Sequence, residues 1–264
     1  MSTALYLGTQ GWSYKDWLGT FYPEGLSPSK FLEWYSSVFD AVEIDSTFYG
    51  TPSRSRVRAW AEITPPDFRF TAKVPRTITH DNHLIDSGQD MEEFLSIMTA
   101  MEEKLGAILI QLPPDYTADE FDGFQSFVSN LPDTIRFAVE FRHRSWLQPD
   151  TFALLREKGM ASAMIDLPYM PRHDEVCADF LYVRWLGDRK QIQRMHEVQI
   201  DRTADLDAWS MRLDRHFQTA RAMFGFVNNH YSGHSPSDVR QLRSRFGIVD
   251  EHPSAVPAVQ GALF

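Results

Sequence analysis

The feature that most constrains the fold of this chain is a regular alternation of short β-rich runs with helical patterns. Eight runs rich in β-branched and aromatic residues recur along the 264 residues. They are Ala4–Gly8, Ala41–Ile44, Arg69–Lys73, Ala107–Gln111, Phe137–Phe141, Ala161–Ile165, Phe180–Trp185 and Met223–Asn228. Strands that alternate with helices form parallel sheets. Eight of them in about 260 residues favour a closed barrel over an open sheet.

Helical periodicity fills most of the intervals between these runs. Over residues 94–105, apolar side chains recur at i, i+3, i+4, i+7 and i+11, which is one face of an amphipathic helix. Residues 167–179 contain two prolines and no such periodicity, which indicates a loop in place of one outer helix. The sequence therefore predicts a single (β/α)₈ TIM-type barrel over residues 1–264, with a loop replacing the helix after the sixth strand.

Composition excludes several classes of protein. The formal net charge of −10 argues against an extended nucleic-acid or anionic-membrane surface, because such surfaces are usually basic. Cys177 is the only cysteine, so no intramolecular disulfide can form. The first residues lack the pattern of a signal peptide, and no apolar run reaches the length of a membrane span. We expect a soluble, cytoplasmic protein.

The candidate site follows from the alternation of side chains along each strand. In the second strand Val42 and Ile44 suit the side that faces the helices, which turns Glu43 and Asp45 inward. Applying the same alternation to the other strands collects charged and amide side chains at the strand ends. The predicted ring comprises Glu43, Asp45, Glu140, Asp166, Lys73, Arg142, Arg184, Gln111 and Asn228 or Asn229. In TIM barrels the active site lies at this end of the strands.

A ring of charges has two interpretations. It can be an ion-pair network that satisfies itself and has no further role. However, apolar residues often replace buried ion pairs without loss of stability, so a large charged ring is more easily explained by a ligand. We therefore interpret it as a functional site.

Several motifs, taken in order, are distinctive. They are Gly8-Thr9-Gln10-Gly11-Trp12-Ser13-Tyr14, Val42-Glu43-Ile44, Phe70-Thr71-Ala72-Lys73, Gln111-Leu112-Pro113-Pro114, Val139-Glu140-Phe141-Arg142-His143 and Asn228-Asn229. Their order and spacing resemble the family called domain of unknown function 72, or YecE-like. The resemblance covers nearly the whole chain and implies a (β/α)₈ barrel, but no activity is established for that family. One departure is Arg184-Trp185-Leu186-Gly187, where the family often has Arg-x-His-Gly.

The residue types favour an enzyme that applies acid/base or hydrolytic chemistry to a small anionic or polyhydroxylated substrate, such as a phosphorylated sugar. The hydrolase, lyase or isomerase class stays open. Glu43 and Glu140 are the candidate acid/base pair, with Asp166 as a third catalytic carboxylate. Lys73, Arg142 and Arg184 suit an anion. The remaining substrate-binding candidates are Gln111, Asn228, Trp12, Tyr14, Tyr49 and His80.

Two alternatives stay open. The first is a divalent-metal-dependent phosphoesterase or isomerase, because carboxylates and loop histidines such as His80 and His230 are suitable ligands. The cations of the ring would repel a metal ion, so no cofactor is predicted, although a divalent metal is possible. The second is a non-enzymatic module that binds a nucleotide, nucleic acid or protein, suggested by Arg142, Arg144 and Trp146.

Overall fold

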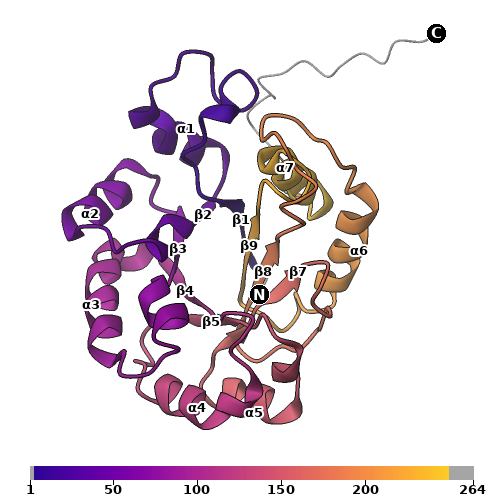
Figure 1. Ribbon diagram of the computed structural model, residues 1–264. Coiled ribbons are helices and arrows are strands. Elements are labelled where there is room, and N and C mark those ends of the chain that lie inside the picture. Colours follow the sequence, from indigo (N-terminus) through magenta and orange to yellow (C-terminus); the bar gives the residue numbers. More distant parts are fainter. Residues whose placement is uncertain (1–2, 250–264) are drawn as a thin grey trace.

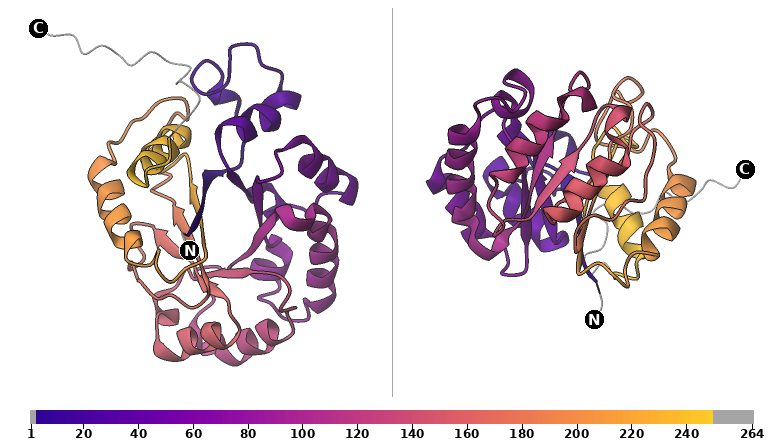
Figure 2. Two further views of the ribbon diagram at one scale, coloured as in Figure 1. Left: turned by 180° about the vertical axis from the view of Figure 1, so that it is seen from behind. Right: turned by 90° about the horizontal axis from the view of Figure 1, so that it is seen from below.

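The protein is described here by a computed structural model that covers residues 3–249. In that range the strands form one parallel sheet in the order β6-β5-β4-β3-β2-β1-β9-β8-β7. They are β1 (Ala4–Gln10), β2 (Ala41–Ile44), β3 (Arg69–Lys73), β4 (Leu105–Gln111), β5 (Phe137–Glu140), β6 (Ala161–Ser162), β7 (Met164–Asp166), β8 (Phe180–Trp185) and β9 (Ala222–Val227). Figures 1 and 2 show this sheet curled into a ring that the helices surround.

The two edges of the sheet are consecutive pieces of one chain segment. β6 and β7 are separated only by Ala163, whose N–H donates to the carbonyl of Val139 (2.8 Å). The predicted sixth strand is therefore present but divided, and it joins the edges of the sheet covalently. The predicted α/β barrel is confirmed.

Seven α-helices within residues 3–249 form the outer layer. They are α1 (Phe31–Val38), α2 (Arg54–Ile63), α3 (Gly88–Met98), α4 (Phe121–Ser129), α5 (Pro149–Glu157), α6 (Thr203–Asp214) and α7 (Ser235–Arg245). Residues 167–179 contain no helix, so the predicted loop after the sixth strand is confirmed. The sequence pattern did not single out α2, since Val57 is its one fully buried residue.

Two apolar layers follow from the alternation along the strands. Val42, Ile44 and Val139 belong to the layer between sheet and helices. Ala138 and Tyr182 belong to the layer inside the barrel. Both assignments match the expectation from the sequence.

Aromatic side chains fill the barrel at the N-terminal ends of the strands. The rings of Tyr6 and Phe224 stack at 5.1 Å, and Phe180 meets Phe224 edge-on at 6.0 Å. Gly106 leaves room for this filling, because a Cβ there would lie 2.5 Å from the Phe224 ring. Such contacts are too short for a tightly packed core to absorb without strain.

In the described part of the chain, no helix is long and apolar enough to cross a membrane.

Candidate functional site

A cavity of about 500 Å³ lies at the opposite end of the barrel, where the strands reach their C-termini. We call it the mouth cavity. Seven of the predicted site residues line it: Lys73, Gln111, Arg142, Arg184, Asn228, Tyr49 and His80. Asp45 of the predicted ring is also present. The β-strands bring these residues together from distant parts of the chain because parallel strands end on the same side of the sheet.

Arg184 is the most deeply buried cation of the mouth cavity and is only 2% exposed. Its Nε and Nη2 donate to the two carboxylate oxygens of Glu43 at 3.0 and 2.7 Å, and its Nη1 donates to Glu140. The hydroxyl of Tyr182 also donates to Glu43 (2.7 Å). This network fixes the plane of the guanidinium beneath the mouth cavity.

Glu43 and Glu140 are fully buried and lie behind the arginines, so neither lines the mouth cavity. Burial raises the pKa of Glu43 despite its pairing with Arg184. Burial alone would also raise the pKa of Glu140, but the charges of Arg142 and Arg184 outweigh it and lower that pKa to about 2. Glu140 has two arginines beside it and Glu43 has one, so the pKa values of the two carboxyl groups shift in opposite directions.

Lys73 is the last residue of β3, and its side chain forms part of the wall of the mouth cavity. Its Nζ lies 3.4 Å from Asp45 Oδ1 and 3.8 Å from the centre of the Phe48 ring. Burial is the largest influence and lowers the pKa of Lys73, and the charge of Arg184 adds to that effect.

His80 reaches the mouth cavity from a π-helical turn, Thr77–Asp81. Such turns are rare and occur often at functional sites. Burial, together with the charges of Lys73 and Arg76, lowers the pKa of His80 to about 4. The imidazole is therefore neutral near pH 7 and can accept a proton or a hydrogen bond.

Asn228 lies at the mouth cavity, but the neighbouring Asn229 does not. The Asn228 amide contacts Gln10 at 2.7 Å, and the Gln10 amide lies 3.2 Å from Arg184. Asn229 instead accepts from the indole of Trp17 (3.2 Å) and the hydroxyl of Ser235 (2.7 Å). Asn228 is thus the amide of this pair that a ligand can reach.

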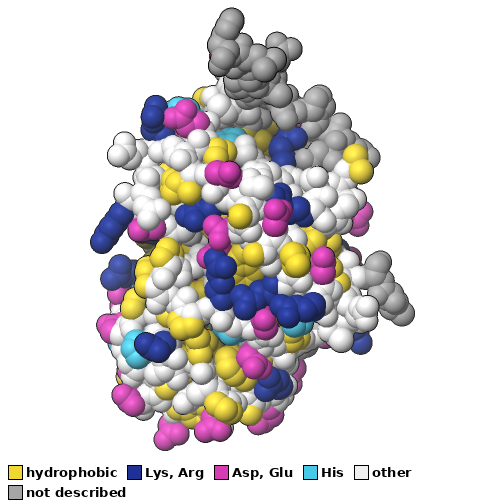
Figure 3. Space-filling model, turned by 90° about the vertical axis from the view of Figure 1, so that its right-hand side faces the viewer, with side chains coloured by type: hydrophobic (Ala, Val, Ile, Leu, Met, Phe, Trp, Pro, Cys, Tyr) yellow, Lys and Arg dark blue, Asp and Glu magenta, His cyan; other side chains and the backbone are white. Residues whose placement is uncertain are grey.

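Asp166 departs from the expected placement. It stands at the end of β7, but its side chain points outward to α6, because Ile165 takes the inward position. Its carboxylate accepts from Trp209 (2.7 Å), Tyr231 (3.1 Å) and Arg172 (2.8 Å). Figure 3 views this side of the molecule, where Lys and Arg side chains mix with Asp and Glu. These hydrogen bonds give Asp166 a structural environment away from the mouth cavity.

The three predicted aromatic residues separate in the structure. Trp12 packs edge-on against Trp60 of α2 at 5.3 Å, away from the cavity lining. Tyr14 packs on Trp17 at 4.6 Å and donates its hydroxyl to the Gln10 carbonyl (2.8 Å). Tyr49 lines the mouth cavity and is 76% exposed. Only Tyr49 is therefore placed to stack on a ligand.

Reasoning from the sequence missed several lining residues. They are Gln10, Arg76, Tyr169, Asp188, Arg189 and Lys190, whereas His230, which also lines the cavity, was considered only as a metal ligand. All of them except Gln10 lie in the loops that follow strands, so a wider search of those loops would have included them. Their side-chain directions depend on loop geometry, which strand alternation does not predict.

The described residues include no group of three or more His, Cys, Asp and Glu side chains arranged to hold a metal ion. The carboxylates beneath the mouth cavity are occupied by guanidinium groups instead. Taken together, fold and site define a (β/α)₈ barrel protein with a predominantly cationic cavity at the C-terminal ends of its strands.

The chain belongs to the family described as "Protein of unknown function DUF72", whose model matches residues 6–261. The resemblance seen in the sequence motifs is thereby confirmed. UPF0759 protein YecE of Escherichia coli (strain K12) is 25% identical, with 98% of this chain and all of that protein covered. UPF0759 protein YunF of Bacillus subtilis (strain 168) is 24% identical over 90% of this chain and 93% of its own length.

Solved structures support the same assignment. A DUF72 family protein from Thermotoga maritima MSB8 matches with a TM-score of 0.81 and 28% identity, covering 92% of this chain and 99% of that one. A second, from Enterococcus faecalis V583, has a TM-score of 0.77 at 21% identity and covers 96% and 98%. The latter likeness concerns the fold alone. The family is one of uncharacterised function.

Proposed function

We propose that the mouth cavity is an enzyme site for a small molecule that carries an anionic group, such as a phosphorylated sugar. The observation that carries this proposal is the charge of the cavity lining. Within the described residues, six cationic side chains line it against two acidic ones. The cations are Lys73, Arg76, Arg142, Arg184, Arg189 and Lys190, and the acids are Asp45 and Asp188.

This local excess is the opposite of the whole chain, whose net charge is −10. Even with Glu43 and Glu140 beneath it, the lining keeps more positive than negative charges. A concave wall of cations concentrates positive electrostatic potential inside the cavity, even on an acidic protein. Arginine suits a phosphate or carboxylate group because its guanidinium can donate two parallel hydrogen bonds to it. Arg184 is held before a ligand arrives, so little ordering is required on binding.

The roles of the carboxylates change in this proposal. Glu43 and Glu140 hold Arg184 and do not face the ligand, so Asp45 and His80 become the candidate acid and base. His80 is neutral near pH 7 and can accept a proton, and an anion bound beside Lys73 and Arg76 would raise its lowered pKa toward the range that general base catalysis favours. Gln111 and Asn228 supply amides for hydroxyl groups. Within the described residues the metal-dependent alternative gains no support, because Glu43 and Glu140 pair with arginines and Asp45 pairs with Lys73.

The test is phosphate binding followed by a search for turnover. We expect inorganic phosphate to bind in calorimetry, and Arg142→Gln to weaken it by about tenfold or more, since a charge-assisted hydrogen bond contributes roughly 1.5–3 kcal/mol. Arg142 suits the test because Glu140 and Arg184 can stay paired without it. Arg136→Gln, at the other end of the barrel, is the matched control.

A panel of phosphorylated sugars followed by ³¹P NMR then separates an enzyme from a binding module. Consumption of one compound by the wild type, lost in His80→Gln or Asp45→Asn, supports acid/base chemistry. Phosphate affinity that is equal in the wild type, Arg142→Gln and Arg136→Gln would overturn the proposal. Tight binding without turnover of any compound would favour the non-enzymatic alternative.

A further inference from the structure

Lys73 has fewer partners than a buried ammonium group normally requires. Its side chain is 8% exposed. Among the described residues, its Nζ has one ion-pair contact, the 3.4 Å approach to Asp45, and one ring contact, with Phe48. A lysine ammonium has three N–H donors. Within the described residues at least two of the three therefore have no hydrogen-bond acceptor, and they can serve a molecule that enters the mouth cavity.

Lys104 shows what a structural lysine looks like in the same protein. Its Nζ donates to the carbonyls of Ala61 (2.5 Å) and Thr64 (2.6 Å) and to the Thr64 hydroxyl (3.2 Å). These acceptors lie at the C-terminal end of α2, where helix carbonyls lack partners. All three donors of Lys104 are used, whereas the donors of Lys73 face a cavity.

The neutral amine form of Lys73 is easier to reach than that of a lysine on the surface, because its pKa is lowered. Burial lowers its pKa most, and the neighbouring Arg184 lowers it further, while Asp45 opposes both. The Phe48 ring, 3.8 Å from Nζ, favours the ammonium form. Desolvation beside another cation is the usual way in which proteins activate a lysine as a nucleophile.

We propose that Lys73 forms an imine with the carbonyl carbon of a small aldehyde or ketone that also carries a phosphate or carboxylate group. This inference rests on the proposed function, since the cationic lining holds the anionic group and so directs the carbonyl to Nζ. It narrows the substrate class from anionic molecules to anionic carbonyl compounds. A cavity of about 500 Å³ accommodates a molecule of that size.

The chemistry balances without any external oxidant or reductant. The lone pair of the neutral amine forms the C–N bond, and the carbonyl π electrons move to oxygen. Nitrogen loses a proton to Asp45, which passes it to the oxygen, and this gives a carbinolamine. The C–O bond then breaks as that oxygen takes a second proton from solvent and leaves as water. The nitrogen lone pair completes the C=N bond as an iminium ion, whose N–H proton returns to solvent and leaves the neutral imine.

Borohydride trapping tests the inference directly. The protein is incubated with D-glyceraldehyde 3-phosphate and sodium cyanoborohydride, and the adducts are located by peptide mass spectrometry. The chain has six lysines, so the map is short: Lys15, Lys30, Lys73, Lys104, Lys158 and Lys190. We expect Lys73 to be modified at least tenfold faster than each of the others, and inorganic phosphate to slow that modification.

Three controls isolate the causes. Lys30→Arg removes a lysine that pairs with Glu33 outside the mouth cavity, and it should not change labelling at Lys73. D-Glyceraldehyde, which lacks the phosphate, should label Lys73 at least tenfold more slowly than its phosphorylated counterpart. Lys73→Arg keeps a cation at this position, and its phosphate affinity by calorimetry reports whether the mouth cavity is intact.

The outcomes separate the two proposals. If phosphate binds but Lys73 reacts no faster than the other five lysines, the imine inference is overturned and the anion site stands. If Lys73 reacts fastest but phosphate neither binds nor protects it, the imine stands and the anion site fails. Fast labelling of Lys73 with protection by phosphate supports both.

Discussion

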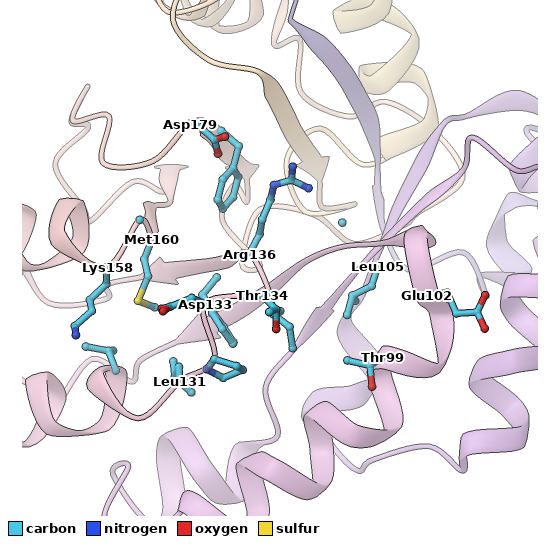
Figure 4. Close-up of a pocket in the computed structure, with 17 residues that line it drawn as sticks. Thr99, Glu102, Leu105, Leu131, Asp133, Thr134, Arg136, Lys158, Met160 and Asp179 are labelled. Carbon is cyan, nitrogen blue, oxygen red and sulfur yellow. The ribbon is translucent and has the colours of Figure 1, made fainter.

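The two ends of this barrel both carry pockets with charged residues, but they hold their charges differently. The pocket at the N-terminal ends of the strands is the larger, at about 610 Å³ against about 500 Å³ for the mouth cavity. Its charged residues include Glu102, Arg136, Lys158 and Asp179. Figure 4 shows Lys158, Asp179 and Glu102 spread apart from one another, with Arg136 between them.

In the N-terminal pocket the charges stay in solvent: Arg136 and Asp179 are both exposed. Behind them the barrel is filled by Phe180 and Phe224. At the mouth cavity, by contrast, Arg184 is almost fully buried and bound by two buried glutamates. Volume alone would favour the N-terminal pocket over the mouth cavity. The cost of burying fixed charges is the reason for proposing that a ligand binds at the mouth cavity instead.

Removing one cation from each end gives the largest expected contrast. Arg184→Met leaves Glu43 buried without a guanidinium and Glu140 with Arg142 alone, and breaking such a buried pair typically costs about 3–5 kcal/mol. Arg136→Met removes only an exposed group 6.0 Å from the Phe180 ring, at a cost below about 1 kcal/mol. Urea denaturation of both variants measures the difference. Similar losses in the two would break the comparison.

A buried acid without a strong cationic partner gives the next contrast. Asp238 in α7 accepts from the Ser232 hydroxyl (2.5 Å), and burial raises its pKa to about 7. Glu140, with two arginines, has a pKa of about 2. The folded protein thus binds a proton at Asp238 that the unfolded chain, with a pKa near 3.9, has already lost. This contribution to stability is complete below pH 4 and disappears as the pH rises through about 7.

Asp238→Asn tests whether stability falls as the pH rises, as this assignment predicts. The free energy of unfolding of the wild type, relative to the variant, should fall by roughly 3 kcal/mol between pH 5 and pH 8, at about 1.4 kcal/mol per pKa unit. Denaturant titrations at several pH values measure it. A difference that stays constant or rises with pH would contradict the assignment of the titrating group to Asp238.

A pair of glycines separates stability from binding at the two ends. Gly106→Ala places a Cβ 2.5 Å from Phe224, and Gly187→Ala places one 2.1 Å from the His230 carbonyl at a φ of +67°. Both should destabilise by about 1–3 kcal/mol. Only Gly187→Ala should also weaken phosphate binding, because Gly187 precedes the segment with Arg189 and Lys190. Equal phosphate affinity in both variants would argue against a role for that loop.

Much of the fold was accessible from the sequence because it depends on local, periodic signals. The positions of the strands and the missing outer helix after residue 166 were both predicted. Alternation also turned Glu43 and Arg184 inward correctly. It failed at Asp166, because the sequence does not say that Trp209, Tyr231 and Arg172 gather on the outer side of β7.

The role of each charged residue in the ring could be assigned only from the tertiary structure. A period of two says which face of a strand a side chain leaves from, and so the sequence alone determined that charges collect at the C-terminal ends of a barrel. Whether Glu43 meets a ligand or a guanidinium depends on a partner 141 residues away in the chain. That contact exists only after closure of the sheet. Closure buried the glutamates behind Arg184 and left Lys73 facing the mouth cavity, because desolvation and pairing depend on distance in space.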